Sequence, residues 1–244
     1  MITKADTYER SGKVRSLLNP QPSLHEGRRG HRILSATGWI LLAALTGTGC
    51  SELSPALTGK APKDLLKLID LDKDSVKGSW TLDDGGLKSP GASFSRVQIP
   101  YVPGDEYNVK LVAQRMLGTD MIALGLVKGG VQFVVGIDGS NKYVASGIDR
   151  IDNKPFSENE TAVKRTLLSN DKASTIEVQV RNESIVVNVD GTKVVDWRGD
   201  YKRLSLFKEW KVPLGNSLFV GTFTQYTIST LELTNLTRGG SYLR

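Results

Sequence analysis

The chain has 244 residues, 39% hydrophobic and 24% charged, which is ordinary for a globular protein with room for one large domain. Its formal net charge of +6 is concentrated before residue 50, and residues 50–244 carry only +2 with both signs interspersed. A phosphate-tracking protein shows a basic stripe or patch, so the charge pattern argues against a nucleic-acid partner. The single cysteine, Cys50, excludes an internal disulfide.

Both histidines, His25 and His31, also precede residue 50. Residues 51–244 therefore contain neither His nor Cys, so they cannot build a Ser-His-Asp triad, a Cys-His dyad or a His-ligated metal site. Any catalysis there must use carboxylates, Lys, Tyr or a carboxylate-held metal. We expect no catalytic residue, no metal and no cofactor.

Residues 28–50 (RRGHRILSATGWILLAALTGTGC) have the three-part layout of a secretory signal. Bases come first, an apolar run extends from Ile33 to about Leu45, and small residues lead to Cys50. The apolar run is short for a spanning helix, which needs about 20 residues. The layout resembles a bacterial lipoprotein signal, in which the cysteine is lipid-modified and begins the mature chain.

This resemblance implies a lipidated Cys50 and a membrane-anchored protein exported to the bacterial cell envelope. Ordinary cleavage, an uncleaved anchor and a twin-arginine signal at Arg28-Arg29 are the alternatives. We therefore predict a cytoplasmic leader and a signal or anchor segment in residues 1–50. Residues 51–64, which contain Ser, Pro and Lys, are predicted to be a tether.

Residues 65–240 are predicted to form one β-sandwich domain, opening with a helical turn or entry strand at 65–71. The candidate strands are 78–82, 86–88, 93–99, 106–115, 121–128, 131–137, 142–146, 165–168, 174–181, 184–189, 192–198, 217–223 and 227–236. Turn pairs such as Asp138-Gly139 and Asp190-Gly191 separate them by supplying positive φ. Many short strands with frequent turns predict an all-β, two-sheet antiparallel sandwich.

In residues 176–197 apolar and polar side chains alternate, so one side should face the core and the other water. Trp197 closes this stretch within a segment that ends at Tyr201, where aromatic rings lie among hydrogen-bonding groups. Arg115 ends a strand, and Gln132 is expected to face it from the next hairpin. We predict that these four residues bind carbohydrate. Core packing of the aromatic rings and plain solvent exposure of the polar groups are the alternatives.

Trp80 and Trp210 are further stacking candidates, again with core or rim packing as the alternative. Oxygen-bearing residues at 138–141 and 149–153 have ligand types that suit calcium, but turn chemistry alone explains them and is the favoured interpretation.

Four groups of residues follow one another in order along the domain. They are 78–80 with 86–87, 96–100 with 106–109, 174–180 with 185–191, and 218–221 with 231–236. In this order they resemble motifs of the concanavalin A-like lectin/glucanase superfamily, and most closely its bacterial laminin-G-like, 3-keto-disaccharide hydrolase-like domains. The resemblance implies a jelly-roll sandwich with a concave, often ligand-bearing sheet.

Glucanases of that superfamily present two carboxylates from a Glu-x-Asp-x-Glu strand, and this sequence lacks that motif. We therefore favour a non-catalytic, envelope-anchored sandwich that binds carbohydrate or another surface partner. The alternatives are a glycoside or keto-sugar hydrolase with dispersed carboxylates, and a structural envelope protein without a small ligand.

Overall fold

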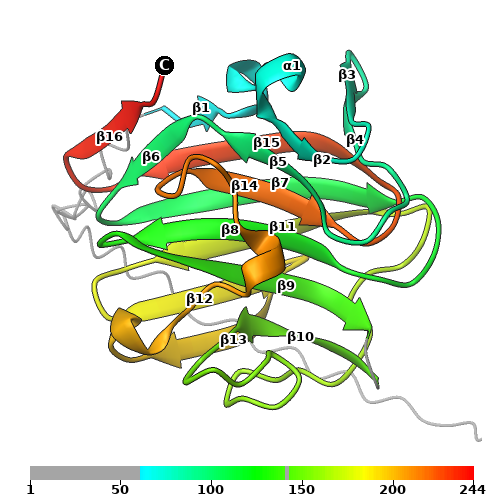
Figure 1. Cartoon of the computed structure of the whole chain (residues 1–244). Helices are drawn as coiled ribbons and strands as arrows, with labels where there is room; N and C mark the ends of the chain where they lie inside the picture. The colour runs from blue at the N-terminus through cyan, green and yellow to red at the C-terminus, as the bar shows by residue number, and fades with distance from the viewer. Residues whose placement is uncertain (1–60, 141–142) are drawn as a thin grey trace, which may run out of the picture. The chain divides into compact units, whose positions relative to one another are not determined.

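The computed structural model of the chain describes residues 61–140 and 143–244 (Figure 1). These residues form an antiparallel two-sheet sandwich, which confirms the predicted all-β fold. The leader, with His25, His31 and Cys50, lies outside the described residues. Within the described residues, no helix is long and apolar enough to cross a membrane.

The larger sheet has eight strands, and all its pairings are antiparallel. Its order is β13 (Thr192–Arg198), β12 (Ser184–Val189), β11 (Ala173–Val180), β7 (Tyr107–Arg115), β15 (Tyr226–Asn235), β4 (Gly86–Lys88) and β3 (Thr81–Asp83), with β1 (Lys63–Asp64) paired to β15.

The second sheet has six strands, also antiparallel. Its order is β10 (Val144–Asp149), β9 (Val131–Ser140), β8 (Ile122–Lys128), β14 (Leu218–Thr222), β5 (Ser95–Ile99) and β2 (Ser75–Lys77). A separate two-stranded ribbon joins β6 (Tyr101–Gly104) to β16 (Gly239–Tyr242). The short helices are η1 (Leu66–Leu68), α1 (Leu71–Asp74), η2 (Tyr201–Arg203) and η3 (Lys208–Trp210).

The core lies between the two sheets, and strand alternation supplies it. In β11, Ile176, Val178 and Val180 are buried, whereas Glu177 and Gln179 on the other face are partly exposed. The paired strand β12 repeats the pattern. The apolar side of the alternating stretch is therefore core, as predicted.

The six-stranded sheet is covered on its outer face as well. Every residue of β14 is buried, and β8 is buried throughout except for Lys128 at its end. A strand that is covered on both faces shows a continuous apolar run instead of alternation. A second apolar cluster forms the outer layer: Met121, Ala123, Val134, Trp210, Val212 and Phe219. In Figure 1 the segment that contains η3 crosses in front of this sheet.

Several predicted boundaries were wrong. Lys63 and Asp64 pair with β15, so they belong to the sandwich and not to the tether. The predicted turn at Pro103-Gly104 lies within β6, which tolerates a proline because it pairs on one side only. Residues 165–168 form no strand.

The predicted turn at Asp138-Gly139 was also wrong, because β9 continues to Ser140. Two residues of β9, Ile137 and Asp138, oppose the single residue Ser146 of β10, which makes a β-bulge. Asp138 has a φ of 55°. Its positive φ therefore serves this bulge and not a hairpin.

Candidate functional site

Trp197 lies on the core side of β13. Val195 and Trp197 are buried, whereas Asp196 and Arg198 are exposed, and only 2% of Trp197 is accessible. Its indole Nε1–H donates to Glu160 Oε1 at 2.8 Å. Trp197 was predicted to bind carbohydrate, with core packing as the alternative, and the structure shows core packing, because Trp197 points to the same side of β13 as Val195. Its ring faces are covered and offer no platform for a sugar.

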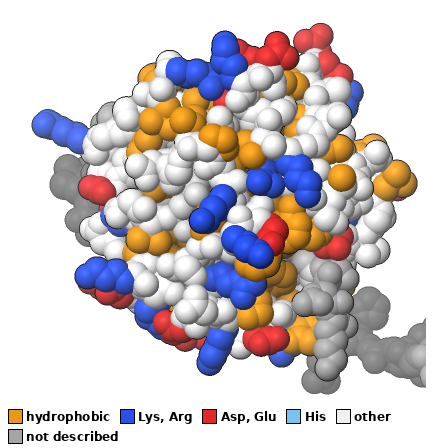
Figure 2. All heavy atoms as spheres, in the orientation of Figure 1, with side chains coloured by type: hydrophobic (Ala, Val, Ile, Leu, Met, Phe, Trp, Pro, Cys, Tyr) orange, Lys and Arg blue, Asp and Glu red, His pale blue; other side chains and the backbone are white. Residues whose placement is uncertain are grey.

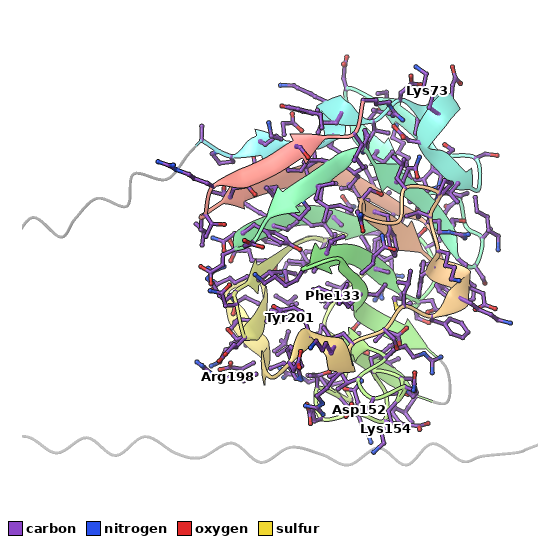
Figure 3. All side chains as sticks on the ribbon, turned by 60° about the vertical axis from the view of Figure 1, so that its left-hand side comes forward. Lys73, Phe133, Asp152, Lys154, Arg198 and Tyr201 are labelled. Carbon is purple, nitrogen blue, oxygen red and sulfur yellow. The ribbon has the colours of Figure 1, made fainter. Side chains whose placement is uncertain are left out.

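Tyr201 is buried too, and its hydroxyl lies 2.9 Å from the Arg181 carbonyl oxygen and 3.0 Å from that of Ser184. Its ring contacts Phe133, with centroids 5.7 Å apart. Figure 3 shows both rings directed into the interior, whereas Arg198 points outward. Burial raises the pKa of the Tyr201 hydroxyl. Tyr201 is therefore a structural anchor for η2.

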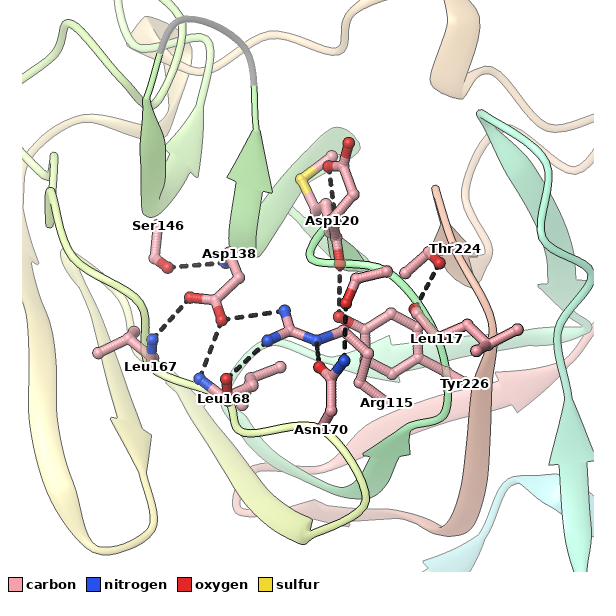
Figure 4. Close-up of polar contacts among 12 residues, drawn as sticks. Arg115, Leu117, Asp120, Asp138, Ser146, Leu167, Leu168, Asn170, Thr224 and Tyr226 are labelled. Carbon is pink, nitrogen blue, oxygen red and sulfur yellow. Dashed lines mark hydrogen bonds and ion pairs between the residues drawn. The ribbon is translucent and has the colours of Figure 1, made fainter. Parts of the chain in front are cut away.

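Arg115 was predicted to bind carbohydrate, with solvent exposure as the alternative, but the structure buries it inside the sandwich. It is 3% exposed and reaches across the sandwich from β7 to Asp138 on β9, with Nη1 3.2 Å from Oδ2 (Figure 4). It also donates to Asn170 Oδ1 at 2.7 Å and to the Leu168 carbonyl oxygen at 2.6 Å. The pair links the two sheets internally.

Asp138 accepts two further hydrogen bonds, from the backbone N–H groups of Leu167 and Leu168 at 2.8 and 2.9 Å. These bonds explain why 165–168 is not a strand, since its backbone donors serve a buried carboxylate. They also occupy the Asp138 oxygens that the calcium alternative required. No group of three or more His, Cys, Asp or Glu is placed to hold a metal ion in the described part of the chain.

Gln132 is half-buried, and its side-chain amide donates to the Ser217 carbonyl oxygen at 2.7 Å. It precedes Asp138 by six positions on β9, a separation of about 20 Å along a strand. Because Arg115 contacts Asp138, it lies far from Gln132. The structure therefore does not gather the four predicted residues into one site.

A pocket of about 340 Å³ lies instead on the outer face of the six-stranded sheet. We call it the aromatic pocket, and its lining residues are Phe94, Asp120, Met121, Gly139, Asp149, Arg150, Pro155, Phe156, Ser157, Phe207, Trp210 and Phe223. Phe94, Phe156, Phe207 and Phe223 are partly exposed, so their rings are available to a ligand. Trp210, at 1% exposed, is part of the buried wall.

The rings contact one another in a connected cluster. Phe94 has centroid distances of 4.4 Å to Phe223, 5.0 Å to Trp210 and 5.9 Å to Phe207. Glycines make room for them on the sheet. A Cβ on Gly221 would lie 2.3 Å from Trp210, and one on Gly139 would lie 2.4 Å from Phe156.

Asp149 and Arg150 give the pocket its buried polar edge. Asp149 ends β10 and is 5% exposed. Burial raises the pKa of its carboxyl, while the neighbouring Arg150 charge and two backbone N–H groups oppose the rise. Asp149 Oδ1 lies 3.8 Å from Arg150 Nε. That Nε is buried and has no hydrogen-bond partner in the described part of the protein.

Arg150 is held by its surroundings. Its guanidinium carbon lies 4.5 Å from the centroid of the Phe207 ring, a cation–π contact. Its Nη1 donates to the Asn153 carbonyl oxygen at 3.2 Å. Three non-glycine residues of this turn, Arg150, Asp152 and Asn153, have positive φ values of 61°, 50° and 64°. Strained backbone of this kind is frequent next to ligand sites.

An ion pair secures the same turn to η2. Arg203 Nη2 lies 2.7 Å from Asp152 Oδ2, and Arg203 Nη1 lies 3.2 Å from Glu160 Oε1. Glu160 in turn accepts from Trp197. In Figure 3, Asp152 and Lys154 mark this loop at the end of the sandwich. Trp197 and Tyr201 thus support the loops around the pocket from the core.

A partly open pocket with aromatic walls, one buried carboxyl and one guanidinium has the composition of a small-molecule site. Trp210 is the only one of its residues that the sequence had marked as a stacking candidate. The available signal was the near-continuous apolar character of 121–127 and 218–223, which indicates a strand covered on both faces.

No protein-family model matches the chain, and no curated protein matches it in sequence. Solved structures similar to it include the carbohydrate-binding module CBM66 from Bacillus subtilis, with 13% identity, a TM-score of 0.39, and coverage of 66% of this chain and 90% of that one.

A putative glycosyl hydrolase from Parabacteroides distasonis is 11% identical over 71% of this chain and 93% of that one, with a TM-score of 0.46. Crh5 transglycosylase in complex with NAG is 10% identical over 72% and 84%, with a TM-score of 0.49. These likenesses concern the fold, and no residue role follows from them.

Proposed function

We propose that this domain binds carbohydrate in the aromatic pocket without cleaving it. The observation that carries the proposal is the group of partly exposed rings, Phe94, Phe156, Phe207 and Phe223, beside Asp149 and Arg150. Aromatic faces suit the apolar C–H face of a pyranose. The carboxyl and the guanidinium supply hydrogen bonds to sugar hydroxyls, and a few such groups in an apolar pocket fix a ligand's orientation.

The test is binding of residues 60–244 to a polysaccharide panel, with sugar release followed in the same wells. Phe207→Ala should weaken binding about tenfold, equivalent to about 1.4 kcal/mol, since it removes one ring face. Tyr242→Ala is the matched control, because Tyr242 is an exposed ring that contacts a single aromatic neighbour on the β6–β16 ribbon. Equal retention of the wild type and Phe207→Ala would refute the proposed site.

A hydrolase is the second candidate, because Asp149 and Asp120 line the same pocket. Glycoside hydrolysis needs a carboxylic acid that stays protonated and a second carboxylate. The raised pKa of Asp149 fits the acid role. Sugar release that disappears in Asp149→Asn, with binding retained, would establish this candidate. Binding without release would leave the non-catalytic function.

Our proposal for the cellular setting rests on the leader, residues 1–50, alone. We propose export to a bacterial cell envelope and membrane anchoring through lipidated Cys50, with residues after it as the tether. Mass spectrometry of the mature chain tests this, since lipidation gives an acylated N-terminal Cys50. A Cys50→Ser variant released from the membrane fraction would agree, and a mature chain that begins elsewhere would refute it. If no polysaccharide binds, a structural envelope role is the remaining hypothesis.

A further inference from the structure

One arginine and two carboxylates line the aromatic pocket, and the residues next to its lining add four bases and one acid. Figure 2 shows Lys and Arg side chains gathered over the face of the molecule that carries the six-stranded sheet. The bases are Lys77, Arg96, Arg150, Lys208 and Lys211, and the acids among the lining and neighbouring residues are Asp120, Asp149 and Glu209. Asp149 is turned toward Arg150, and Glu209 toward Lys208 at 3.5 Å.

Two of these cations, Lys77 and Arg96, contact Phe94, and Arg96 also bonds to the backbone of Lys211. Lys77 Nζ lies 5.9 Å from the centroid of the Phe94 ring. Arg96 donates from Nη1 to the Phe94 carbonyl oxygen at 3.0 Å and from Nε to the Lys211 carbonyl oxygen at 2.8 Å. Among the described residues, no carboxylate forms an ion pair with Lys77, Arg96 or Lys211. Lys77 and Lys211 are therefore without a carboxylate in an ion pair, whereas Arg96 is influenced by the charge of Glu209.

Phe207, whose ring contacts Phe94, also lies beside a cation. Arg150 stacks on its ring at 4.5 Å and has an unbonded Nε inside the pocket wall. That Nε is covered and faces Asp149 at 3.8 Å, so a ligand would meet the exposed part of the Arg150 side chain instead. Arg96 is half-buried, and burial lowers its pKa although Glu209 opposes the effect. Both guanidinium groups would gain from an anionic partner.

We infer that the carbohydrate held in the aromatic pocket is an acidic glycan, with a carboxylate-bearing sugar lying against the Phe94 and Phe207 rings, which contact each other. The inference rests on the proposed function and names the substrate class for that site. The rings take the apolar sugar face, while Arg150 beside Phe207 and Lys77 and Arg96 beside Phe94 receive the carboxylates, with Lys211 as the next base along the chain from Trp210. Planar guanidinium groups match carboxylate geometry well.

Binding of polygalacturonate, alginate and hyaluronan is compared with binding of the methyl-esterified form of each polymer. Esterification removes the charge and keeps the sugar rings, so at least one acidic form should bind and its ester should bind more weakly. Affinity for that acidic form should also fall with added salt, because salt screens exposed charges. Equal binding of acid and ester would overturn the inference and leave the proposed function standing. Binding of neither, across the whole panel, would remove both.

Charge variants test the location. Lys77→Gln combined with Lys211→Gln should weaken binding of the acidic polymer about fivefold, from two exposed charge contacts. Lys110→Gln with Lys172→Gln removes the same charge from the eight-stranded sheet, where Lys110 lies on β7 and Lys172 precedes β11. This control should bind as the wild type does. Equal losses in both double variants, or equal retention of a DNA duplex, would show that the protein responds to charge alone and would overturn the inference.

Discussion

Arg115→Met removes the cation from a buried ion pair, and the burial of that pair determines how far the free energy of unfolding should fall. Arg115 and Asp138 are 3% and 0% exposed. After the substitution Asp138 keeps the Leu167 and Leu168 N–H groups, while the Leu168 carbonyl and Asn170 each lose a donor. Breaking a buried pair on one side costs about 3–5 kcal/mol. For a domain of this size that corresponds to a decrease of about 6–20 °C in Tm.

Urea unfolding followed by circular dichroism measures this change. The midpoint should fall with the slope m unchanged. Arg198→Met, on the exposed face of β13, is the control and should stay within about 0.5 kcal/mol of the wild type. A double variant, Arg115→Met with Asp138→Asn, should recover part of the loss, because no unpaired charge stays buried and asparagine keeps an acceptor oxygen and tolerates the positive φ. A change below about 1 kcal/mol in Arg115→Met would refute the argument that this pair joins the sheets.

Three further outcomes follow from the same structure. Trp197→Ala should lower the free energy of unfolding by about 3–5 kcal/mol, as expected for a Trp in the core. Calorimetry measures this loss, and an unchanged Tm would contradict the burial of Trp197. The free energy of unfolding of Asp149→Asn should rise relative to that of the wild type as pH rises above 3.8, because the raised folded-state pKa of Asp149 makes its charged form unfavourable. Urea titrations from pH 4 to 8 measure this difference, and the opposite trend would refute it. Gly221→Ala should displace the Trp210 ring and cost about 1–3 kcal/mol, with a shift in Trp fluorescence, and wild-type stability and emission would argue against the close contact.

Strand identity was largely readable from the sequence because it depends on local alternation. The stretch from 176 to 189 alternates with period two, and β11 and β12 bury the predicted residues. The sequence also indicated which face of the strand Trp197 occupies, since Trp197 follows the apolar Val195 by two positions on β13.

Long-range contacts decided the rest. Nothing local marks Arg115 and Asp138 as partners, because they lie on strands of different sheets and meet only when the sandwich closes. Asp138-Gly139 has turn composition, yet the bulge against Ser146 uses its positive φ to aim the carboxylate inward. The same carboxylate accepts the hydrogen bond of the Leu168 backbone N–H, which would otherwise pair with a neighbouring strand.

The aromatic pocket could not be predicted from the sequence for the same reason. Its rings come from four separate places in the chain, namely a loop before β5, the segment after β10, the residue before η3 and the residue after β14. Phe94, Phe156, Phe207 and Phe223 are therefore neighbours only in space. Alternation along the chain determined which side of each strand is apolar. The sequence did not determine that loops would cover the outer face of the six-stranded sheet and form a second apolar layer with a pocket. The tertiary structure decided this, because the segments that cover a strand are distant from it in sequence.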